Sequence, residues 1–318
     1  MYSYQPNNHI HTKYYPKALS FILMTIIVSF FLLSCSDINS TINSEFDDFI
    51  EILDTNFESH LLALGIDTEG LIDQKILKSD AELVTRLSVN KDENSIDGRI
   101  EDLTGIGGFV NLTYLSVQSQ GLKSINLEKN TLLDTLLIGD NYLEGLDVSQ
   151  NDSLVYLDAI FNELKVISGL NELSNLTELQ LSYNYLETLQ VENANLERLF
   201  VSDNLLKNVN VSGAENLSNV YVPRNQLEEF HVNDNINLET LILSDNKLTS
   251  IELEDLSKLE VLYISSNELT SLNISNNDKL VDFRPNRNPG LYCIQVSPIQ
   301  IIPNVYLSDY QELSSNCE

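Results

Sequence analysis

The chain has 318 residues, with 18 lysines and arginines against 47 aspartates and glutamates, and a formal net charge of −29 at pH 7. This charge argues against nucleic acid and anionic lipid headgroups as partners, because basic surfaces supply most of the affinity for both. The simplest interpretation is that the scattered acidic residues keep an elongated surface soluble. The alternative is attraction to a basic partner or to divalent cations.

Residues 1–35 are expected to be a targeting segment. Lys13 and Lys17 give it a basic start, and an apolar run follows over residues 18–34. The run ends in Leu32-Leu33-Ser34-Cys35, which resembles the bacterial lipoprotein signal and implies that Cys35 receives lipid and becomes the mature N-terminus. An uncleaved membrane anchor is the alternative, because the run approaches the minimum length of a spanning helix.

Both interpretations predict an exported protein that is tethered to a membrane. The residue after the cysteine is Ser36. An aspartate at this position would disfavour the outer membrane, so the serine leads us to expect a bacterial outer-membrane or cell-surface location. Whether the protein faces outward or into the periplasm stays open. Residues 36–44 are polar and predict a tether.

Residues 45–83 are expected to form a helical cap, because the end coil of a repeat stack needs a cover. A first helix is indicated by apolar residues at helical spacing: Phe46, Phe49, Ile50 and Leu53. A second helix is predicted to open with the capping box Thr55-x-x-Glu58 and to end at Gly65. Its apolar face consists of Phe57, Leu61 and Leu64.

One pattern then repeats at a nearly constant spacing, and we assign residues 84–288 to it. Its clearest copy is Leu133-x-x-Leu136-x-Ile138-x-x-Asn141-x-Leu143-x-x-Leu146-x-Val148. Further copies begin at Leu154, Leu176, Leu196, Leu217, Leu238, Leu259 and Leu280, and an earlier one begins at Leu112. Self-similarity at a period of about 21 residues predicts a solenoid with one supersecondary unit per repeat.

The start of the repeats is irregular. A copy at Val84-x-x-Leu87-x-Val89 is followed by an acidic insertion over residues 91–97, which we expect to be a mobile loop that delays the next coil to Ile100-x-x-Leu103.

Within each unit the apolar residues alternate, as at Leu136 and Ile138 and again at Leu146 and Val148. Alternation is the period of a β-strand, and the repeat is too short for a typical helix plus a strand. Each unit is therefore predicted to contain a short strand, a turn and a second extended arc. Stacking on both neighbours buries the apolar face that no single coil covers.

An asparagine recurs eight residues after the first leucine of each regular copy, and Gln120 takes its place in the copy at Leu112. A buried asparagine amide serves main-chain groups at the bend of its own coil and of the next one, so we predict a structural ladder. Exposed turn asparagines are the alternative. The eight ladder residues are Asn141, Asn162, Asn184, Asn204, Asn225, Asn246, Asn267 and Asn288.

These residues resemble the leucine-rich repeat family, in its bacterial 21-residue subclass with a nested half-repeat. The resemblance covers residues 84–318 and rests on nine consecutive copies. It implies an α/β repeat solenoid, a curved right-handed coil with a parallel sheet on its concave side. It also implies a binding scaffold rather than an enzyme.

Residues 289–318 are expected to be a C-terminal cap. With Cys35 assigned to lipid, Cys293 and Cys317 remain, and in an exported protein they are predicted to form a disulfide that closes the end of the chain. Two free buried thiols are the alternative.

The strand residue that follows the second leucine faces solvent in each copy. Along the stack this slot holds Ser116, Leu137, Asp158, Gln180, Phe200, Tyr221, Ile242, Tyr263 and Arg284. Flanking slots add Tyr156, Ile160, Phe161 and Tyr183, and the patch is bordered by Arg198, Arg224, Arg284 and Arg287. Because parallel strands lie ~4.8 Å apart, we predict one contiguous partner-binding patch on the concave face. The alternative is that these side chains only stabilise the strands.

We expect neither an enzyme nor a cofactor. Only His60 and His231 follow the targeting segment, on elements expected to lie far apart, and no histidine has metal-ligand spacing. Asp67-Thr68-Glu69-Gly70 is interpreted as a turn, and Gly105-Ile106-Gly107-Gly108 lacks the features of a phosphate loop.

The sequence therefore predicts a lipid-anchored protein that binds a macromolecule, most simply a protein, in surface adhesion or assembly. The alternative is a carbohydrate-binding surface protein in which Phe200, Tyr221 and Tyr263 stack on sugar rings. An accessory domain or weak hydrolase is a third hypothesis.

Overall fold

The computed structural model describes residues 48–91 and 98–317. The targeting segment, Cys35, the tether and most of the insertion after Lys91 lie outside the described residues. Ile50–Glu318 form one compact unit, within which the fold is described here. Across the residues that are described, the helices are too short or too polar to cross a bilayer.

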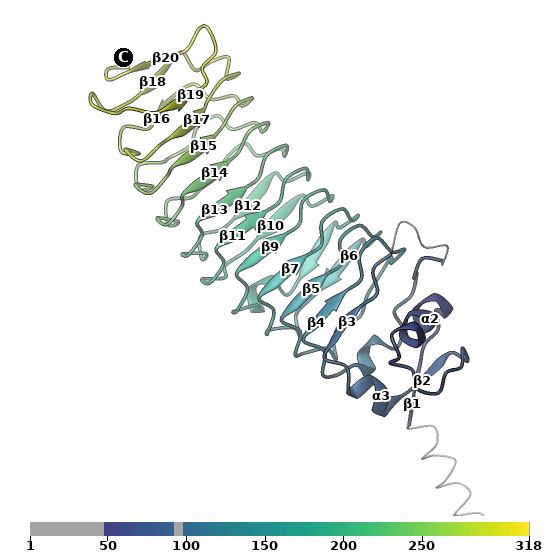
Figure 1. The fold of residues 1–318 in the computed structure, drawn as a ribbon. Helices are drawn as coiled ribbons and strands as arrows, with labels where there is room; N and C mark the ends of the chain where they lie inside the picture. Colours follow the sequence, from purple (N-terminus) through teal and green to yellow (C-terminus); the bar gives the residue numbers. More distant parts are fainter. Residues whose placement is uncertain (1–47, 92–97, 318) are drawn as a thin grey trace, which may run out of the picture. The chain divides into compact units, whose positions relative to one another are not determined.

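Each coil contributes one short strand to a long parallel sheet, which is the predicted leucine-rich repeat architecture (Figure 1). Neighbouring strands come from successive coils, so the chain adds one strand per turn of the solenoid. The eleven strands are, in spatial order, β3 (Arg86–Ser88), β4 (Tyr114–Ser116), β5 (Thr135–Leu137), β7 (Tyr156–Asp158), β9 (Glu178–Gln180), β11 (Arg198–Phe200), β13 (Asn219–Tyr221), β14 (Thr240–Ile242), β15 (Val261–Tyr263), β17 (Asp282–Arg284) and β19 (Asn304–Val305).

The second arcs of seven coils contain short strands, which form three small parallel sheets on the other side of the coils. Two of them pair β6 (Gly145–Asp147) with β8 (Val166–Ser168) and β10 (Thr188–Gln190) with β12 (Asn208–Asn210). The third joins β16 (Leu272–Asn273), β18 (Cys293–Gln295) and β20 (Glu312–Ser314). Two coils also contain a single 3-10 turn, η1 (Ile106–Gly108) and η2 (Leu170–Glu172).

The core is a column of repeat leucines between these two sides. The middle residue of each long-sheet strand faces inward, and register pairs Leu136 with Leu157 and Leu199 with Val220, all with no exposed surface. Burying each such side chain contributes roughly 1.5–3 kcal/mol. Since that burial requires a neighbouring coil on each side, stacking is what holds the fold together.

The N-terminal cap contains α2 (Thr55–Ala63), α3 (Lys78–Glu82) and the strands β1 (Phe49–Glu51) and β2 (Lys75–Leu77). The prediction of a helix through Phe49 and Ile50 is wrong, because these residues are in β1. Ile50, Glu51 and Ile52 alternate apolar and polar residues, which is a strand pattern. The backbone N–H of Ile52, directly after β1, donates to the carbonyl of Gln74 at 2.8 Å.

The second cap helix exists, but its start differs from the prediction. Asp54 is the N-cap residue, and its side chain accepts the backbone N–H groups of Asn56 and Phe57. Glu58 is fully buried and instead accepts the N–H groups of residues 73, 74 and 75. Leu64 lies off the predicted apolar face and is 54% exposed, whereas Gly65 ends the helix with φ of 69°.

The described residues that follow the insertion continue the first coil and do not open a second one. Ile100 carries no strand; its carbonyl accepts the N–H of Gly121, and its own N–H donates to the side chain of Gln120. Residues 100–103 are therefore level with the second arc of the next coil. The prediction that Ile100 opens a new coil is wrong, because the half-repeat motif occurs in both arcs.

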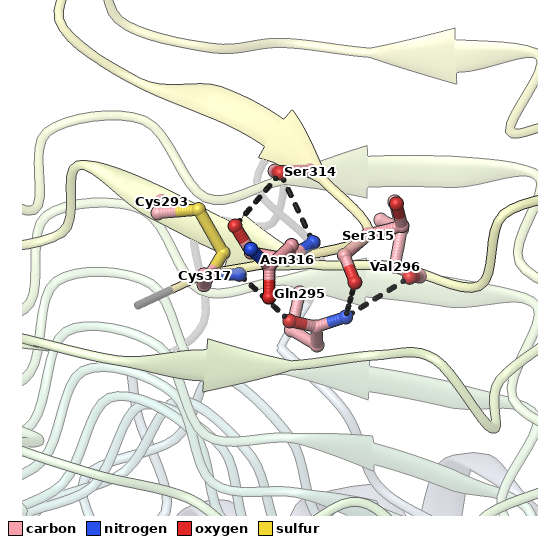
Figure 2. The surroundings of a disulfide bond; sticks show 7 residues. All are labelled: Cys293, Gln295, Val296, Ser314, Ser315, Asn316 and Cys317. Atoms are coloured by element: carbon pink, nitrogen blue, oxygen red, sulfur yellow. Dashed lines mark hydrogen bonds between the residues drawn. A yellow bond between two sulfur atoms is a disulfide. The ribbon is translucent and has the colours of Figure 1, made fainter.

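The C-terminal cap is closed by a disulfide between Cys293 and Cys317, whose Cα atoms are 5.6 Å apart (Figure 2). Beside it, the Gln295 side chain accepts the N–H of Cys317 at 3.1 Å and donates to the carbonyl of Ser315 at 2.8 Å. The bridge and these hydrogen bonds hold the chain end against β18. The alternative of two free thiols is thereby excluded.

Candidate functional site

The eight predicted ladder asparagines are all at most 8% exposed, and each connects its own coil to the preceding one. Asn162 is representative: its amide donates to Ile138 of the preceding coil at 3.0 Å and to Ala159 of its own coil at 3.2 Å. Its Oδ1 accepts the N–H of Leu143 at 3.1 Å. Each ladder amide thus bonds to main-chain groups, so the ladder runs through the main chain rather than from amide to amide.

Glutamines take over where the end coils are irregular. The Gln120 amide donates to the carbonyl of Val89 at 2.6 Å, and that of Gln311 donates to Pro285 at 3.1 Å.

A second ladder was not found in the sequence. It consists of Asn130, Asn151, Asn193, Asn235 and Asn277, all buried and three residues before the first leucine of their copies. The amide of Asn193 donates to the carbonyls of Leu170 and Leu173, at 2.8 and 2.7 Å. The signal is weak because Leu173, Ala214 and Leu256 occupy the same position in alternate coils.

The residue before each ladder asparagine adopts a left-handed backbone conformation. Its φ is 51° at Phe161, 59° at Tyr183, 54° at Arg224 and 61° at Arg287, whereas the remaining coils place aspartate or serine there. Left-handed backbone costs about 1–2 kcal/mol for a side chain larger than glycine, and bulky residues avoid it. Bulky side chains at these turns therefore point to a role outside the fold.

The outward residues of the long sheet form what we call the sheet column: Phe200, Tyr221, Ile242, Tyr263, Arg284 and Tyr306, from six successive coils. The rings of Phe200 and Tyr221 are stacked with centroids 4.7 Å apart and planes 15° apart. Tyr221, Ile242 and Tyr263 follow in register on β13, β14 and β15. The stacked rings therefore stand on edge, with faces turned towards neighbouring coils.

Arg284 joins the end of this column to the C-terminal cap. Its guanidinium lies 4.0 Å from the ring centre of Tyr263 and 4.7 Å from that of Tyr306, and it pairs with Asp282. The same ion pair lowers the pKa of Asp282. Tyr306 was missed in the sequence because its coil has lost the repeat leucines, although it follows Arg284 at close to the repeat spacing.

Phe161 and Tyr183 form a separate group, the turn cluster, together with Asp203 and Arg224. The two rings are stacked at 4.3 Å and nearly parallel, and they are 50% and 43% exposed. Arg224 pairs with Asp203 through two guanidinium nitrogens, and hydrogen bonding to Asp203 together with Tyr183 raises the pKa of the arginine.

Polar side chains on β7, β9 and β11 form a further group on the same sheet. Arg198 pairs with Glu178, and the Gln180 amide donates to the Tyr156 hydroxyl at 2.9 Å. Burial, with the nearby carboxylates of Asp158 and Glu178, raises the pKa of Tyr156 to about 12. Two stacked pairs, Phe161–Tyr183 and Phe200–Tyr221, thus lie on and beside the sheet, and a single contiguous patch stays a prediction.

Two further residues of the predicted patch lie at the turns that follow the strands. Ile160 is half-buried next to the turn cluster, and Arg287 occupies the left-handed position of its coil. His60 is in α2 and His231 is on an exposed second arc. No group of three or more potential metal ligands occurs within residues 48–91 and 98–317.

Parallel coils, ladder amides and an outward face of aromatic residues define a leucine-rich repeat solenoid. Solved structures agree in fold. The chain is similar to a leucine-rich repeat protein of Leptospira interrogans, with 19% identity, a TM-score of 0.51, and coverage of 74% of this chain and 73% of that one. It is also similar to the APL1 leucine-rich repeat domain, with 22% identity, a TM-score of 0.60, and coverage of 74% and 66%.

Internalin C2 of Listeria monocytogenes is a third such structure, with 19% identity, a TM-score of 0.50, and coverage of 78% of this chain and 92% of that one. These identities support the fold alone. No protein-family model matches the chain, and comparison with curated proteins gives no match.

Proposed function

We propose that this protein binds a protein partner on the outer face of its long sheet, with the sheet column at the centre of the contact. The observation that carries the proposal is six successive coils presenting aromatic, branched or stacked arginine side chains in one line. Tyrosine, phenylalanine and arginine are among the residues enriched at protein interfaces, and tyrosine and arginine often supply the energetic anchors.

A purely structural role for the sheet column explains the distribution of aromatic residues less well than partner binding does. If rings were needed only to stabilise strands, the matching slots of the second arc would benefit equally. Those slots hold mainly small or polar residues: Gly145, Val166, Thr188, Asn208, Glu229, Ser250 and Ser271. The aromatic residues are concentrated on one side of the solenoid, which favours recognition.

Ring orientation favours a protein over a glycan. A sugar stacks on an open ring face, but Phe200 and Tyr221 cover one another, and one face of Tyr263 is covered by Arg284. Strands ~4.8 Å apart leave no room for a sugar between adjacent rings. The ring edges and the Tyr221 hydroxyl remain available for a protein surface.

The test uses a photo-crosslinking amino acid in place of Ile242, with the same substitution at exposed Val166 on β8 as the control. We expect one crosslinked protein species from Ile242 and none from Val166. The double variant Tyr221→Ser/Tyr263→Ser should abolish that capture while retaining the fold by circular dichroism. Glycan-array binding that this double variant abolishes, without protein capture, would establish the carbohydrate alternative.

We also propose that the protein is exported and anchored through lipid on Cys35, at the bacterial cell surface or outer membrane. The proposal rests on the basic start, the apolar run and the cysteine that closes it. Labelling with a palmitate analogue should mark the wild type and not Cys35→Ser. An absence of label from both proteins, together with an unprocessed N-terminus, would favour the uncleaved anchor.

We infer no catalytic role. Among the described residues His60 and His231 lie on separate elements, in the cap helix and on a second arc of the repeats. A nucleophile with an oriented base requires such groups to converge.

A further inference from the structure

The N-terminal cap exposes large apolar side chains that its core does not use. The segment between α2 and β2 carries Leu64, Leu71 and Ile72, each more than half exposed. Leu83, directly after α3, is 80% exposed. Single apolar residues scattered over a surface are ordinary, whereas several on one small cap indicate an interaction site.

Polar contacts fix the segment that carries these side chains. The N–H and the hydroxyl of Thr68 both donate to the carboxylate of Asp80 in α3, at 3.0 and 2.6 Å. The buried carboxylate of Glu58 accepts the N–H groups of residues 73 and 74, at 2.8 and 2.7 Å. The exposed leucines and isoleucine therefore lie on an ordered segment that is joined to α3.

Leu83 is one of two exposed leucines at a repeat position that is polar elsewhere. The position lies directly before the first apolar residue of each copy, and Leu132, 48% exposed, is the other leucine. The polar residues at this position are Asn111, Ser153, Asn175, Asn195, Asn216, Asn237, Lys258 and Lys279. The Asn195 amide, for example, donates to the carbonyl of Ser174 in the preceding coil at 2.9 Å. Leucine cannot make this bond, and both leucines belong to the first three copies, next to the cap.

The chain enters the solenoid at this same cap, coming from the proposed lipid anchor. The N–H of Ile52 donates to the carbonyl of Gln74 at 2.8 Å, so the entering chain lies beside the segment that carries Ile72. From Cys35 to Ile50 the chain spans at most about 50 Å when fully extended. An anchor on Cys35 therefore holds the cap close to the bilayer, which is the apolar partner nearest to the exposed leucines.

We propose that the N-terminal cap docks on the lipid bilayer, with Leu71, Ile72 and Leu83 inserted at the level of the headgroups. This proposal rests on the proposed anchor, because the anchor brings the cap to the membrane. The net charge of −29 does not favour anionic lipid, so docking depends on apolar contact with zwitterionic lipid and persists at high salt. Docking fixes the orientation of the solenoid on the membrane, which attachment through one lipidated residue does not.

The test uses the full chain, purified with its lipid and reconstituted in vesicles of phosphatidylcholine and phosphatidylethanolamine. The chain contains no tryptophan, so Leu71→Trp and Leu83→Trp each introduce a single fluorescent reporter. We expect both to emit at shorter wavelength on vesicles than in detergent-free solution. Brominated phosphatidylcholine should quench both several-fold more strongly than Tyr292→Trp, a control at the C-terminal cap where Tyr292 is 64% exposed.

A second set of variants tests whether the apolar side chains cause the contact. With Ile72→Trp as the reporter, Leu71→Ser/Leu83→Ser should remove most of the quenching by brominated lipid. Ile299→Ser/Ile301→Ser removes two side chains that are 86% and 84% exposed at the other end of the solenoid, so it should leave the quenching unchanged. All four replaced residues are exposed, and circular dichroism confirms that both double variants fold.

Flotation of the wild type with the vesicles distinguishes failure of the docking from failure of the anchor. Equal quenching of Leu83→Trp and Tyr292→Trp in protein that floats would overturn the docking and leave the anchor standing. Wild-type protein that neither carries the palmitate label nor floats would overturn both. A shift of Leu83→Trp emission that grows with protein concentration, without quenching by brominated lipid, would overturn the docking and identify a second copy of the chain as the occupant.

Discussion

Leu143 donates its backbone N–H to the side-chain oxygen of Asn162 in the next coil, at 3.1 Å. Both residues are buried, so the bond decides whether a main-chain N–H is satisfied at the bend where the strand ladder ends. This relationship distinguishes the two asparagine ladders, because the Oδ1 atoms of the second ladder have no partner among the described atoms.

We predict that Asn204→Leu is far more damaging than Asn193→Leu. Loss of Asn204 leaves the N–H of Leu186 without its partner, whereas the carbonyl of Leu181 keeps the amide of Asn184. A buried unsatisfied group costs about 1–3 kcal/mol, so the variant should lose about that much stability. Urea unfolding of both variants measures the difference.

Asn193 is the matched control from the second ladder. The carbonyls that it caps, Leu170 and Leu173, also accept N–H groups from Leu173 and Leu176. Its substitution should therefore cost less than about 1 kcal/mol, because each carbonyl keeps one partner. Equal losses for the two variants would show that the Oδ1 bond to the next coil does not matter.

Much of this fold could be predicted because the same physical requirement recurs in every coil. The leucine spacing predicted the core, and the recurring asparagine predicted the bend after each strand. The errors fall where repetition ends: Phe49 and Ile50 satisfy strand and helix periods alike, and Tyr306 belongs to a coil whose leucines have gone. The second ladder was hidden because Leu173 and Ala214 interrupt it.

The candidate site was predictable only in part, for a different reason. Spacing placed Phe200, Tyr221 and Tyr263 on one face, yet it did not show that the rings cover one another. It also could not show that Arg284 lies over the rings of both Tyr263 and Tyr306. Such features depend on the register between coils, and no single repeat contains them.

We predict that the disulfide stabilises the C-terminal cap and little else. In the loop-entropy model, a bridge between cysteines this far apart in the chain contributes about 3 kcal/mol. Each coil contacts only its neighbours, so Cys293→Ser/Cys317→Ser should accelerate amide exchange near β20. Exchange around β11, in the middle of the stack, is the internal reference, and an equal acceleration there would contradict a local role.

Replacing Arg284 with glutamine should release Tyr306. The guanidinium contacts the rings on both sides, and such a contact contributes about 0.5–1 kcal/mol at an exposed site. We expect faster nitration of Tyr306 by tetranitromethane in Arg284→Gln, measured by peptide mass spectrometry. Arg287→Gln removes a nearby charge outside this ring contact, so it should leave the rate unchanged; equal acceleration would indicate a general charge effect.

Asp158 should reduce stability at neutral pH. Burial raises the pKa of its carboxyl, and Glu178 raises it further, whereas the N–H of Ile160 opposes the shift. A raised pKa means that the folded state binds a proton more readily than the unfolded state, so stability falls as pH rises from the ordinary aspartate range through the raised pKa. Asp158→Asn removes this penalty and retains an acceptor for Ile160.

The variant should therefore melt at a higher temperature than the wild type at pH 7, and the two should converge as the pH is lowered towards 4, where the aspartate becomes protonated. Thermal unfolding followed by circular dichroism at both pH values measures the difference. Asp245→Asn, at a turn in a remote coil, serves as the control and should not change the melting temperature at either pH. A wild type more stable than Asp158→Asn at pH 7 would mean that the folded chain already compensates the carboxylate, which would contradict the predicted penalty.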